Sequence, residues 1–368
     1  MIVTFLPVDR TNDPTDTNKQ KLRRNLFYFR FARQAMRAAI EELTLEKNKI
    51  VLMPASVCPA VLEPFINAGI KIRLYSLNHN LKWDINEIRD KICNDTIAVY
   101  TIHYFGILYD LTAIRLLCNE KQVKLIEDCA LAGYHEGTTI GETGDIAIFS
   151  LWKFHPLSGG AILKFNNEVP SFLRVNLETS RLITILIGLL KIRIKSLMSK
   201  LSLQPNSWRR ELSKRKHMQD PAPIDTRNQP YAIQKMHNLD FSIFCKENLY
   251  ECAKRRRTNY FTLAETAKNA GIELLYTEVD SNSVPYCLPI VIDDAHRLQR
   301  VFLRAGIQTE ISINQPYANQ PYLCESNESF DDINYLSNQV LGIPVHQNLT
   351  VRQITHMKEQ LIAWGRKI

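Results

Sequence analysis

The sequence predicts an α/β protein in which a large domain with a mostly parallel sheet precedes a smaller α/β domain. Through the first half of the chain, short apolar runs rich in β-branched residues alternate with segments of helical periodicity, which is typical of βαβ units. After about residue 235 the pattern changes to a long helix followed by short strands and helices. A chain of 368 residues is long enough for both parts. We therefore expect a three-layer α/β/α domain over residues 1–235 and a small domain over 236–368.

The elements of the large domain follow one another after a polar, irregular start of about 25 residues. ARQAMRAAIEEL (32–43) has apolar residues at helical spacing, and Pro59 is tolerated in the first turn of the next helix. KIRLY (71–75) alternates as a strand does. In chain order we expect helices at 32–43, 57–68, 85–92 and 111–119, and strands at 49–53, 71–75, 97–102, 123–126, 146–149 and 161–165.

Residues 181–217 carry most of the charge asymmetry of the chain. They hold ten Lys or Arg and one acid, whereas the whole chain has a formal net charge of +8. The segment begins with a strongly apolar helix at 181–201, whose uninterrupted apolar run, 182–190, is far shorter than the ~20 residues that cross a bilayer. Two interpretations stay open: peripheral contact of 181–217 with an anionic membrane surface, or a core or dimer-interface helix followed by a solvated basic loop. Residues 202–230 contain four prolines and are expected to form a loop.

The small domain is expected to begin with a helix at 244–264. A strand, a second strand at 289–292 and helices at 295–305 and 351–361 complete it.

Cysteine usage and the start of the chain indicate a cytoplasmic protein. The eight cysteines are scattered, without a CxxC pair or a histidine cluster at ligand spacing, which argues for reduced thiols and against a zinc site. The first residues lack the basic region of a signal peptide. Nothing in the sequence indicates a groove-reading helix or a base-stacking platform, so nucleic acid is not an expected partner.

Chemistry-bearing residues follow two strands that we expect to be neighbours. Glu127 and Asp128 come directly after the strand at 123–126, and Ser150 and Lys153 follow the end of the strand at 146–149. Ligands of α/β sheets bind outside the carboxyl ends of the strands. An Asp, a Lys and a Ser together can hold pyridoxal 5'-phosphate (PLP), because the Asp keeps the pyridine nitrogen protonated, the Lys forms a Schiff base and the Ser donates to the phosphate. The alternative interpretation is that the acid is a solvated strand-end residue and Lys153 is an ordinary surface lysine, without a cofactor.

Taken in order, several segments resemble the DegT/StrS family of PLP-dependent sugar aminotransferases, which have the fold type I architecture. The resemblance covers roughly residues 25 to 365. It is carried by ARQAM (32–36), MPASVCPAVLEPFINAGIKIRLYSL (53–77), IHYFG (102–106), IEDCALA (126–132), GETGDIAIFS (141–150), SVPYCLPIVI (283–292), RAGI (304–307) and LGIPVHQNLT (341–350).

The resemblance implies a role for each matching residue. Asp128 falls on the acid that pairs with the pyridine nitrogen, and Ser150 falls on the phosphate site. The backbone amides around Arg33 and Gln34, at a helix start, also fall on the phosphate site. Lys153 corresponds to the Schiff-base lysine of family members with a shortened segment, to which SLWKFHPLSGG (150–160) is similar.

Three departures from the family pattern leave alternatives open. The family lysine usually lies five residues after the serine, where this chain has His155, and a related sugar dehydratase uses a histidine there as its base. Leu131 replaces a Gln or His that bonds the cofactor ring oxygen, and Cys58 stands near the position of a stacking aromatic residue. A PLP- or PMP-dependent dehydratase using His155 and a non-catalytic binding or scaffold protein are therefore the alternatives.

The leading prediction is a transaminase that acts on a nucleotide-linked keto sugar with an amino-acid donor such as glutamate, in polysaccharide or secondary-metabolite biosynthesis. The resemblance also implies a homodimer with sites at the subunit interface.

Overall fold

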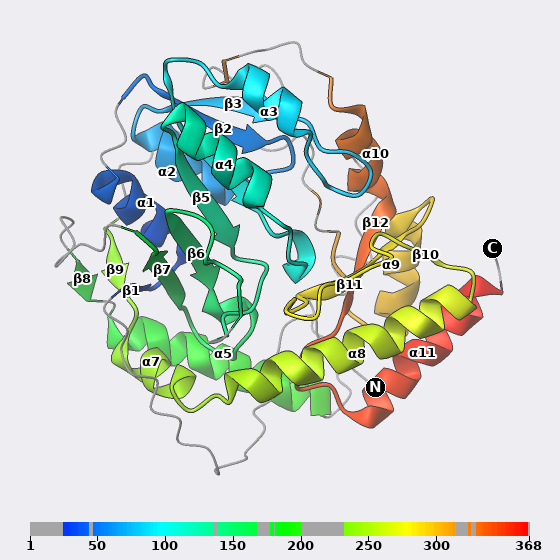
Figure 1. Ribbon diagram of the computed structural model, residues 1–368. Helices are drawn as coiled ribbons and strands as arrows, with labels where there is room; N and C mark the ends of the chain where they lie inside the picture. Colours follow the sequence, from blue (N-terminus) through cyan, green and yellow to red (C-terminus); the bar gives the residue numbers. More distant parts are fainter. Residues whose placement is uncertain are drawn as a thin grey trace.

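The computed structural model describes residues 25–43, 47–135, 138–167, 177–179, 181–200, 232–311, 313, 323–324 and 329–366. Its larger part is built on a sheet of nine strands in the order β3-β2-β4-β5-β6-β7-β1-β9-β8 (Figure 1). The strands from β2 to β6 pair in parallel, whereas β7 runs antiparallel to both β6 and β1. Their bounds are β1 Leu26–Phe29, β2 Ile50–Pro54, β3 Lys71–Tyr75, β4 Thr96–Ile102, β5 Lys124–Cys129, β6 Ile146–Ser150, β7 Ala161–Phe165, β8 Glu178–Thr179 and β9 Gln234–Lys235.

Four helices cover the parallel part of this sheet. α1 (Ala32–Glu42) packs against α2 (Pro59–Asn67), whereas α3 (Ile85–Lys91) packs against α4 (Thr112–Lys121), and Figure 1 shows α3 and α4 together in front of the sheet. Right-handed crossovers from β2 to β3 and from β3 back to β4 place α2 and α3 on opposite faces. Strands β2, β6 and β7 are consequently buried along their whole length, which explains why their sequences are almost entirely apolar, with Ser150 and Lys164 as the exceptions.

The smaller part follows as an antiparallel sheet of three strands, β10 (Glu273–Leu274), β11 (Cys287–Val291) and β12 (Val340–Pro344). The helices after β9 are α7 (Asn238–Phe244), α8 (Leu249–Asn269), α9 (Ala295–Arg304), α10 (Asp331–Gln339) and α11 (Val351–Gly365). The long helix α8 packs along α11 and against β10 and β11.

A close backbone contact joins the two parts at the loop after β4. The Tyr286 amide donates to the Phe105 carbonyl at 2.7 Å. Gly106 has a φ of +79°, and a Cβ there would lie 2.3 Å from the Val284 carbonyl oxygen. Only glycine fits this position without moving the small domain away from the loop.

The predicted fold class is confirmed: the protein is α/β with a large, mostly parallel sheet and a fold type I architecture. The expected helix at 244–264 is wrong in its bounds, because α7 ends at Phe244 and α8 begins at Leu249 and continues to Asn269. Strand β1, which directly follows the expected irregular start, was not expected, and neither were α10 and β12.

The expected apolar helix at 181–201 is present as α5 (Leu182–Lys200). The loop predicted at 202–230 and the basic residues at 201–217 lie outside the described residues. Within the described ranges, no helix is both long and apolar enough to cross a bilayer.

Candidate active site

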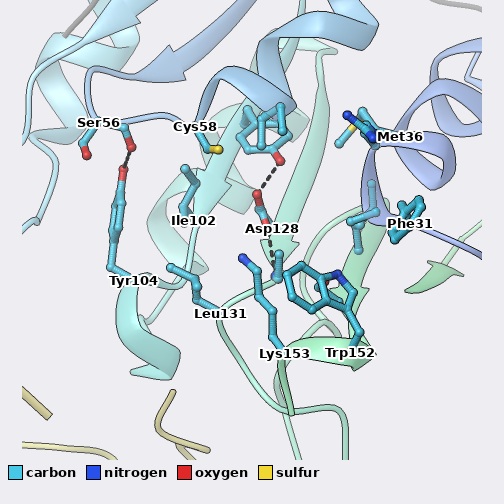
Figure 2. Close-up of a pocket in the computed structure, with 18 residues that line it drawn as sticks. Phe31, Met36, Ser56, Cys58, Ile102, Tyr104, Asp128, Leu131, Trp152 and Lys153 are labelled. Carbon is cyan, nitrogen blue, oxygen red and sulfur yellow. Dashed lines mark hydrogen bonds between the residues drawn. The ribbon is translucent and has the colours of Figure 1, made fainter. Parts of the chain in front are cut away.

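A cavity of about 350 Å³ opens at the carboxyl ends of β4, β5 and β6, beside the first turns of α1 and α2 (Figure 2). Most of its wall is apolar, and a few polar groups converge on it, as is typical of small-molecule sites. It is lined by Phe31, Ala32, Arg33, Met36, Ser56, Cys58, Ala60, Val61, Tyr100, Ile102, Tyr104, Asp128, Ala130, Leu131, Ile148, Ser150, Trp152 and Lys153.

Asp128 provides the carboxylate of the cavity. One oxygen accepts a 2.6 Å hydrogen bond from the Tyr100 hydroxyl, and the other accepts a 2.7 Å bond from the Ala130 amide. Burial raises the pKa of this carboxyl above its ordinary value, and the two hydrogen bonds and the positive charge of Lys153 only partly offset that effect. A cationic group in the cavity would therefore find a fixed, poorly solvated carboxylate.

Glu127, the other member of the acidic pair, lies away from the cavity because successive strand residues point to opposite faces. It accepts a 2.8 Å bond from His103 Nε2, and it also accepts bonds from the amides of Gly141 and Gly144 at 2.7 and 2.9 Å. Burial alone would raise the pKa of Glu127, but His103 and these amides hold it below its ordinary value. Glu127 thus anchors the glycine-containing turn and takes no part in the site.

Lys153 and Ser150 reach the cavity from the end of β6. The chain leaves β6 at Ser150 and makes a 3₁₀ turn over Leu151–Lys153, which brings the lysine back over the strand end. Figure 2 shows the Lys153 amine directed toward Asp128, with Trp152 beside it. The Lys153 amine also lies 5.8 Å from the ring centroid of Tyr286, so the small domain contributes to its surroundings.

His155 does not line the cavity, although it follows Lys153 by only two residues. Its buried ring packs edge-on against Phe244 at 5.4 Å between centroids, and Nδ1 lies 3.5 Å from a Glu247 carboxylate oxygen. The short turn after Lys153 therefore sends the two side chains in different directions. The structure brings Lys153, and not His155, together with Asp128.

The first turns of α1 and α2 supply groups suited to an anion. In α1 the amides of Gln34 and Ala35 already donate to the Phe31 carbonyl, so the amides of Ala32 and Arg33 are the ones that precede the intrahelical bonds. The Gln34 side chain lies outside the cavity and donates to the Ala232 carbonyl at 2.9 Å. Gln34 itself therefore does not line the cavity, whereas Ala32 and Arg33 do.

Arg33, Cys58 and Leu131 all line the cavity. The Arg33 guanidinium lies 3.7 Å from the Glu63 carboxylate and remains about half exposed. Cys58 is an exposed residue at the start of α2.

Two polar residues of the site were not predicted from the sequence. Tyr100 lies two residues before the end of β4, and its role depends on how β4 and β5 pair. Ser56 has a buried hydroxyl that lines the cavity and makes no hydrogen bond to any described residue. The motif around residues 53–58 placed a site at this strand end but did not single out the serine.

Comparison with known proteins agrees with this geometry. The model of the DegT/DnrJ/EryC1/StrS aminotransferase family matches residues 32–176. The chain is 26% identical over 129 residues to GDP-perosamine synthase from Vibrio cholerae, and the aligned residues cover 34% of this chain and 35% of that protein. It is 32% identical over 123 residues to a dTDP-3-amino-3,6-dideoxy-alpha-D-galactopyranose transaminase from Aneurinibacillus thermoaerophilus, and the aligned residues cover 32% of this chain and 31% of that protein. The chain thus matches about a third of the length of these relatives.

Solved structures resemble the chain over nearly all of its length. The aminotransferase TlmJ from Streptoalloteichus hindustanus superposes with a TM-score of 0.67 at 17% identity, covering 94% of this chain and 86% of that one. The PLP form of a putative sugar aminotransferase from Streptococcus pneumoniae superposes with a TM-score of 0.68 at 13% identity, covering 93% and 87%. At these identities the likeness establishes the fold.

Proposed function

We propose that this chain, a member of the DegT/DnrJ/EryC1/StrS aminotransferase family by its match over residues 32–176, is a PLP-dependent transaminase of nucleotide-linked keto sugars. The observation that carries the proposal is the pairing of Asp128 and Lys153 in one cavity beside two helix starts. A carboxylate, an amine and an anion-binding region are the three groups that PLP requires of a protein.

The described residues fit the cofactor. The buried Asp128 carboxylate would hold a proton on the pyridine nitrogen, and the Lys153 amine would attach the cofactor covalently. The phosphate would take hydrogen bonds from Ser150 and from the amides of Ala32 and Arg33 at the start of α1. When bound, PLP supplies an electron-accepting ring that allows an amino group to pass from an amine donor to a keto carbon.

The protein's own residues would perform three tasks around the cofactor. Tyr100 orients the Asp128 carboxylate through its 2.6 Å hydrogen bond, so the acid needs no reorganisation when it binds a cation. Lys153, once released from the cofactor, would move a proton at Nζ to and from the reacting carbon. Trp152 and Leu131 line the wall beside Lys153 and would keep water away from that proton.

The substrate class follows the names of the relatives, which are a GDP-linked and a dTDP-linked sugar enzyme. We propose a nucleotide-linked keto sugar as acceptor and an amino acid such as glutamate as donor, in polysaccharide or secondary-metabolite synthesis. A cytoplasmic homodimer is part of the same proposal.

Of the two alternatives, the His155 dehydratase is disfavoured by the position of that ring outside the cavity. A non-catalytic homologue remains the competing function, because Leu131 and Cys58 remove two contacts that the family pattern contains.

The test is the visible absorption spectrum of the purified protein with added PLP, before and after borohydride reduction, followed by peptide mass mapping. We expect an absorbance typical of a lysine-bound cofactor, and a reduced adduct on Lys153. The Lys153→Ala variant should lose the adduct and turnover, while Lys164→Ala, a buried lysine bonded to the Gly141 carbonyl at 3.0 Å, should keep the adduct. Absence of any bound cofactor in the wild type would favour the non-catalytic homologue, and turnover by Lys153→Ala would exclude the role given to this lysine.

A further inference from the structure

Helix α5 exposes an unusual amount of apolar surface. Thirteen large apolar side chains are exposed among the described residues, and seven of them belong to this one helix. Successive residues of an α-helix are rotated by 100° about its axis, and on this basis six of the seven side chains project within an arc of about 100° around the axis of α5. Each of the six is between 46% and 62% exposed. We call these six the apolar stripe: Ile183, Leu186, Ile187, Leu190, Ile194 and Leu197.

The opposite side of α5 is attached to the protein. Ile185 is fully buried, and Leu189 packs against the core. Gly188 lies so close to the loop after Lys153 that a Cβ there would come within 2.6 Å of the Ser158 Cβ. The helix is thus held by one face, and the stripe points away from the body of the molecule. Figure 1 shows α5 at the periphery of the protein, beside α7.

Positive charges flank the stripe. Arg193 projects about 20° beyond one edge and Lys191 about 40° beyond the other by the same helical geometry, and both side chains are exposed. Arg181 is exposed just before the helix begins. The nineteen residues of α5 include no Asp or Glu. An apolar arc with a cation on each side is the arrangement of helices that lie in the plane of a membrane interface, where long basic side chains reach the headgroups.

Charge also decides between the two surfaces that could cover the stripe. In a symmetric contact between two copies, each α5 would bring its own Lys191 and Arg193 beside those of its partner, and the helix carries no acid to pair with them. An anionic bilayer offers hydrocarbon to the stripe and negative headgroups to both edges. We propose that α5 is a peripheral membrane anchor, with the apolar stripe inserted into the interfacial region of an anionic lipid surface.

Co-sedimentation of the full chain with lipid vesicles tests this proposal. The probes are vesicles of phosphatidylcholine alone and vesicles containing one quarter phosphatidylglycerol, each at about 50 mM and about 500 mM salt, since screening separates surface charge from apolar insertion. We expect strong binding to the anionic vesicles at low salt, weaker binding at high salt and little binding to neutral vesicles.

Variants separate the two parts of the anchor. Leu186→Ser with Leu190→Ser should reduce partitioning about 10- to 100-fold through lost apolar burial. Lys191→Gln with Arg193→Gln should reduce it about 30-fold on anionic vesicles only, because each cation near such a surface contributes a factor of about five. Leu116→Ser is the matched control, since Leu116 is 64% exposed on α4, and its binding should equal that of the wild type.

Circular dichroism on the same samples measures the folding of each variant, and light scattering measures its molecular mass, so that a loss of vesicle binding can be distinguished from unfolding or a change of oligomeric state. The exposed positions of all five substituted residues predict unchanged folding. Failure of the wild type to bind anionic vesicles at low salt would overturn the proposal. Vesicle binding by the Leu186→Ser/Leu190→Ser variant equal to that of the wild type would also overturn it. A third contrary result is a wild type that does not bind lipid and is a dimer, together with a Leu186→Ser/Leu190→Ser variant that is a monomer, since a second copy would then cover the stripe.

Discussion

Tyr100 and Asp128 are joined by a 2.6 Å hydrogen bond between neighbouring strands β4 and β5, inside the candidate active-site cavity. The pairing of the strands aligns Ile102 with Asp128, so Tyr100 reaches the carboxylate from two residues further back. Burial raises the pKa of Asp128, and the tyrosine is the strongest of the groups that oppose this effect. The hydroxyl therefore helps to keep the acid ionised, which is the form that binds a protonated pyridine nitrogen.

The first prediction follows from that bond. In Tyr100→Phe the Asp128 carboxylate loses a donor, its pKa rises further, and a charged acceptor is left with one partner. A hydrogen bond to a charged group contributes roughly 1.5–3 kcal/mol, so we expect PLP affinity to fall by about 10- to 100-fold. Titration of the apoprotein with PLP, followed by absorbance, measures this change.

Tyr75→Phe is the matched control for that experiment. The Tyr75 hydroxyl is also buried and donates to the Tyr100 carbonyl at 2.9 Å, but Tyr75 does not line the cavity. This variant should lose some stability and keep wild-type PLP affinity. Equal affinities for Tyr100→Phe and the wild type would show that the tyrosine does not support the acid.

The second prediction concerns pH, because Glu127 and Asp128 are shifted in opposite directions. The pKa of Glu127 is lower in the folded protein, so its contribution to stability is present above the unfolded value of about 4.3 and is lost as pH falls through the folded pKa. The pKa of Asp128 is raised, so its buried charge costs stability above the folded pKa, and that cost disappears on acidification.

Glu127→Gln separates the two effects in the cofactor-free protein. The variant should be less stable than the wild type by about 3 kcal/mol at pH 7, because a buried, hydrogen-bonded charge is removed from its partners. Its melting temperature should also fall less than that of the wild type between roughly pH 5 and roughly pH 3, because the contribution of Glu127 is lost from about the unfolded glutamate pKa downward. Thermal unfolding at pH 7 and over this acidic range measures both effects. An acid limb as steep as that of the wild type would show that Glu127 does not contribute to it.

The third prediction separates His155 from Lys153. His155 contacts Phe244 and Glu247 outside the cavity, so His155→Asn should keep the borohydride-fixed adduct and turnover within about threefold, a change of less than about 1 kcal/mol. Its melting temperature should fall, because a buried ring is removed. Loss of turnover in a variant that still forms the adduct would make His155 a catalytic candidate again.

Much of the fold was predictable because its signals are local. The buried strands β2, β4, β6 and β7 have mostly apolar sequences, and α1 shows a helical stripe, so each was recognised within a few residues. Helix α7 was not predicted, and the helix expected at 244–264 began five residues before α8. Here Asp240 accepts bonds from the Ser158 amide and hydroxyl at 2.9 and 2.6 Å, a tertiary contact that holds α7 against a distant loop.

The site was predictable only where the position of a residue in a strand indicates the direction of its side chain. Alternation along β5 required one of Glu127 and Asp128 to face away from the other, and the family resemblance selected Asp128. The directions of Lys153 and His155 depend on the 3₁₀ turn Leu151–Lys153, and the contribution of Tyr100 depends on strand pairing. Neither the turn nor the pairing has a signature in the sequence.

The last prediction concerns Leu131, which lines the cavity where the family pattern has a Gln or His. A glutamine there would offer the cofactor ring oxygen a donor that leucine lacks. We expect Leu131→Gln to tighten PLP binding about fivefold, equivalent to roughly 1 kcal/mol for one net hydrogen bond. Leu131→Met is the control, since it changes shape without adding a donor and should leave the dissociation constant nearly unchanged. The PLP titration used for Tyr100→Phe measures both variants. Weaker binding by Leu131→Gln than by Leu131→Met would mean that the apolar wall at this position, and not a missing donor, is what the cofactor needs.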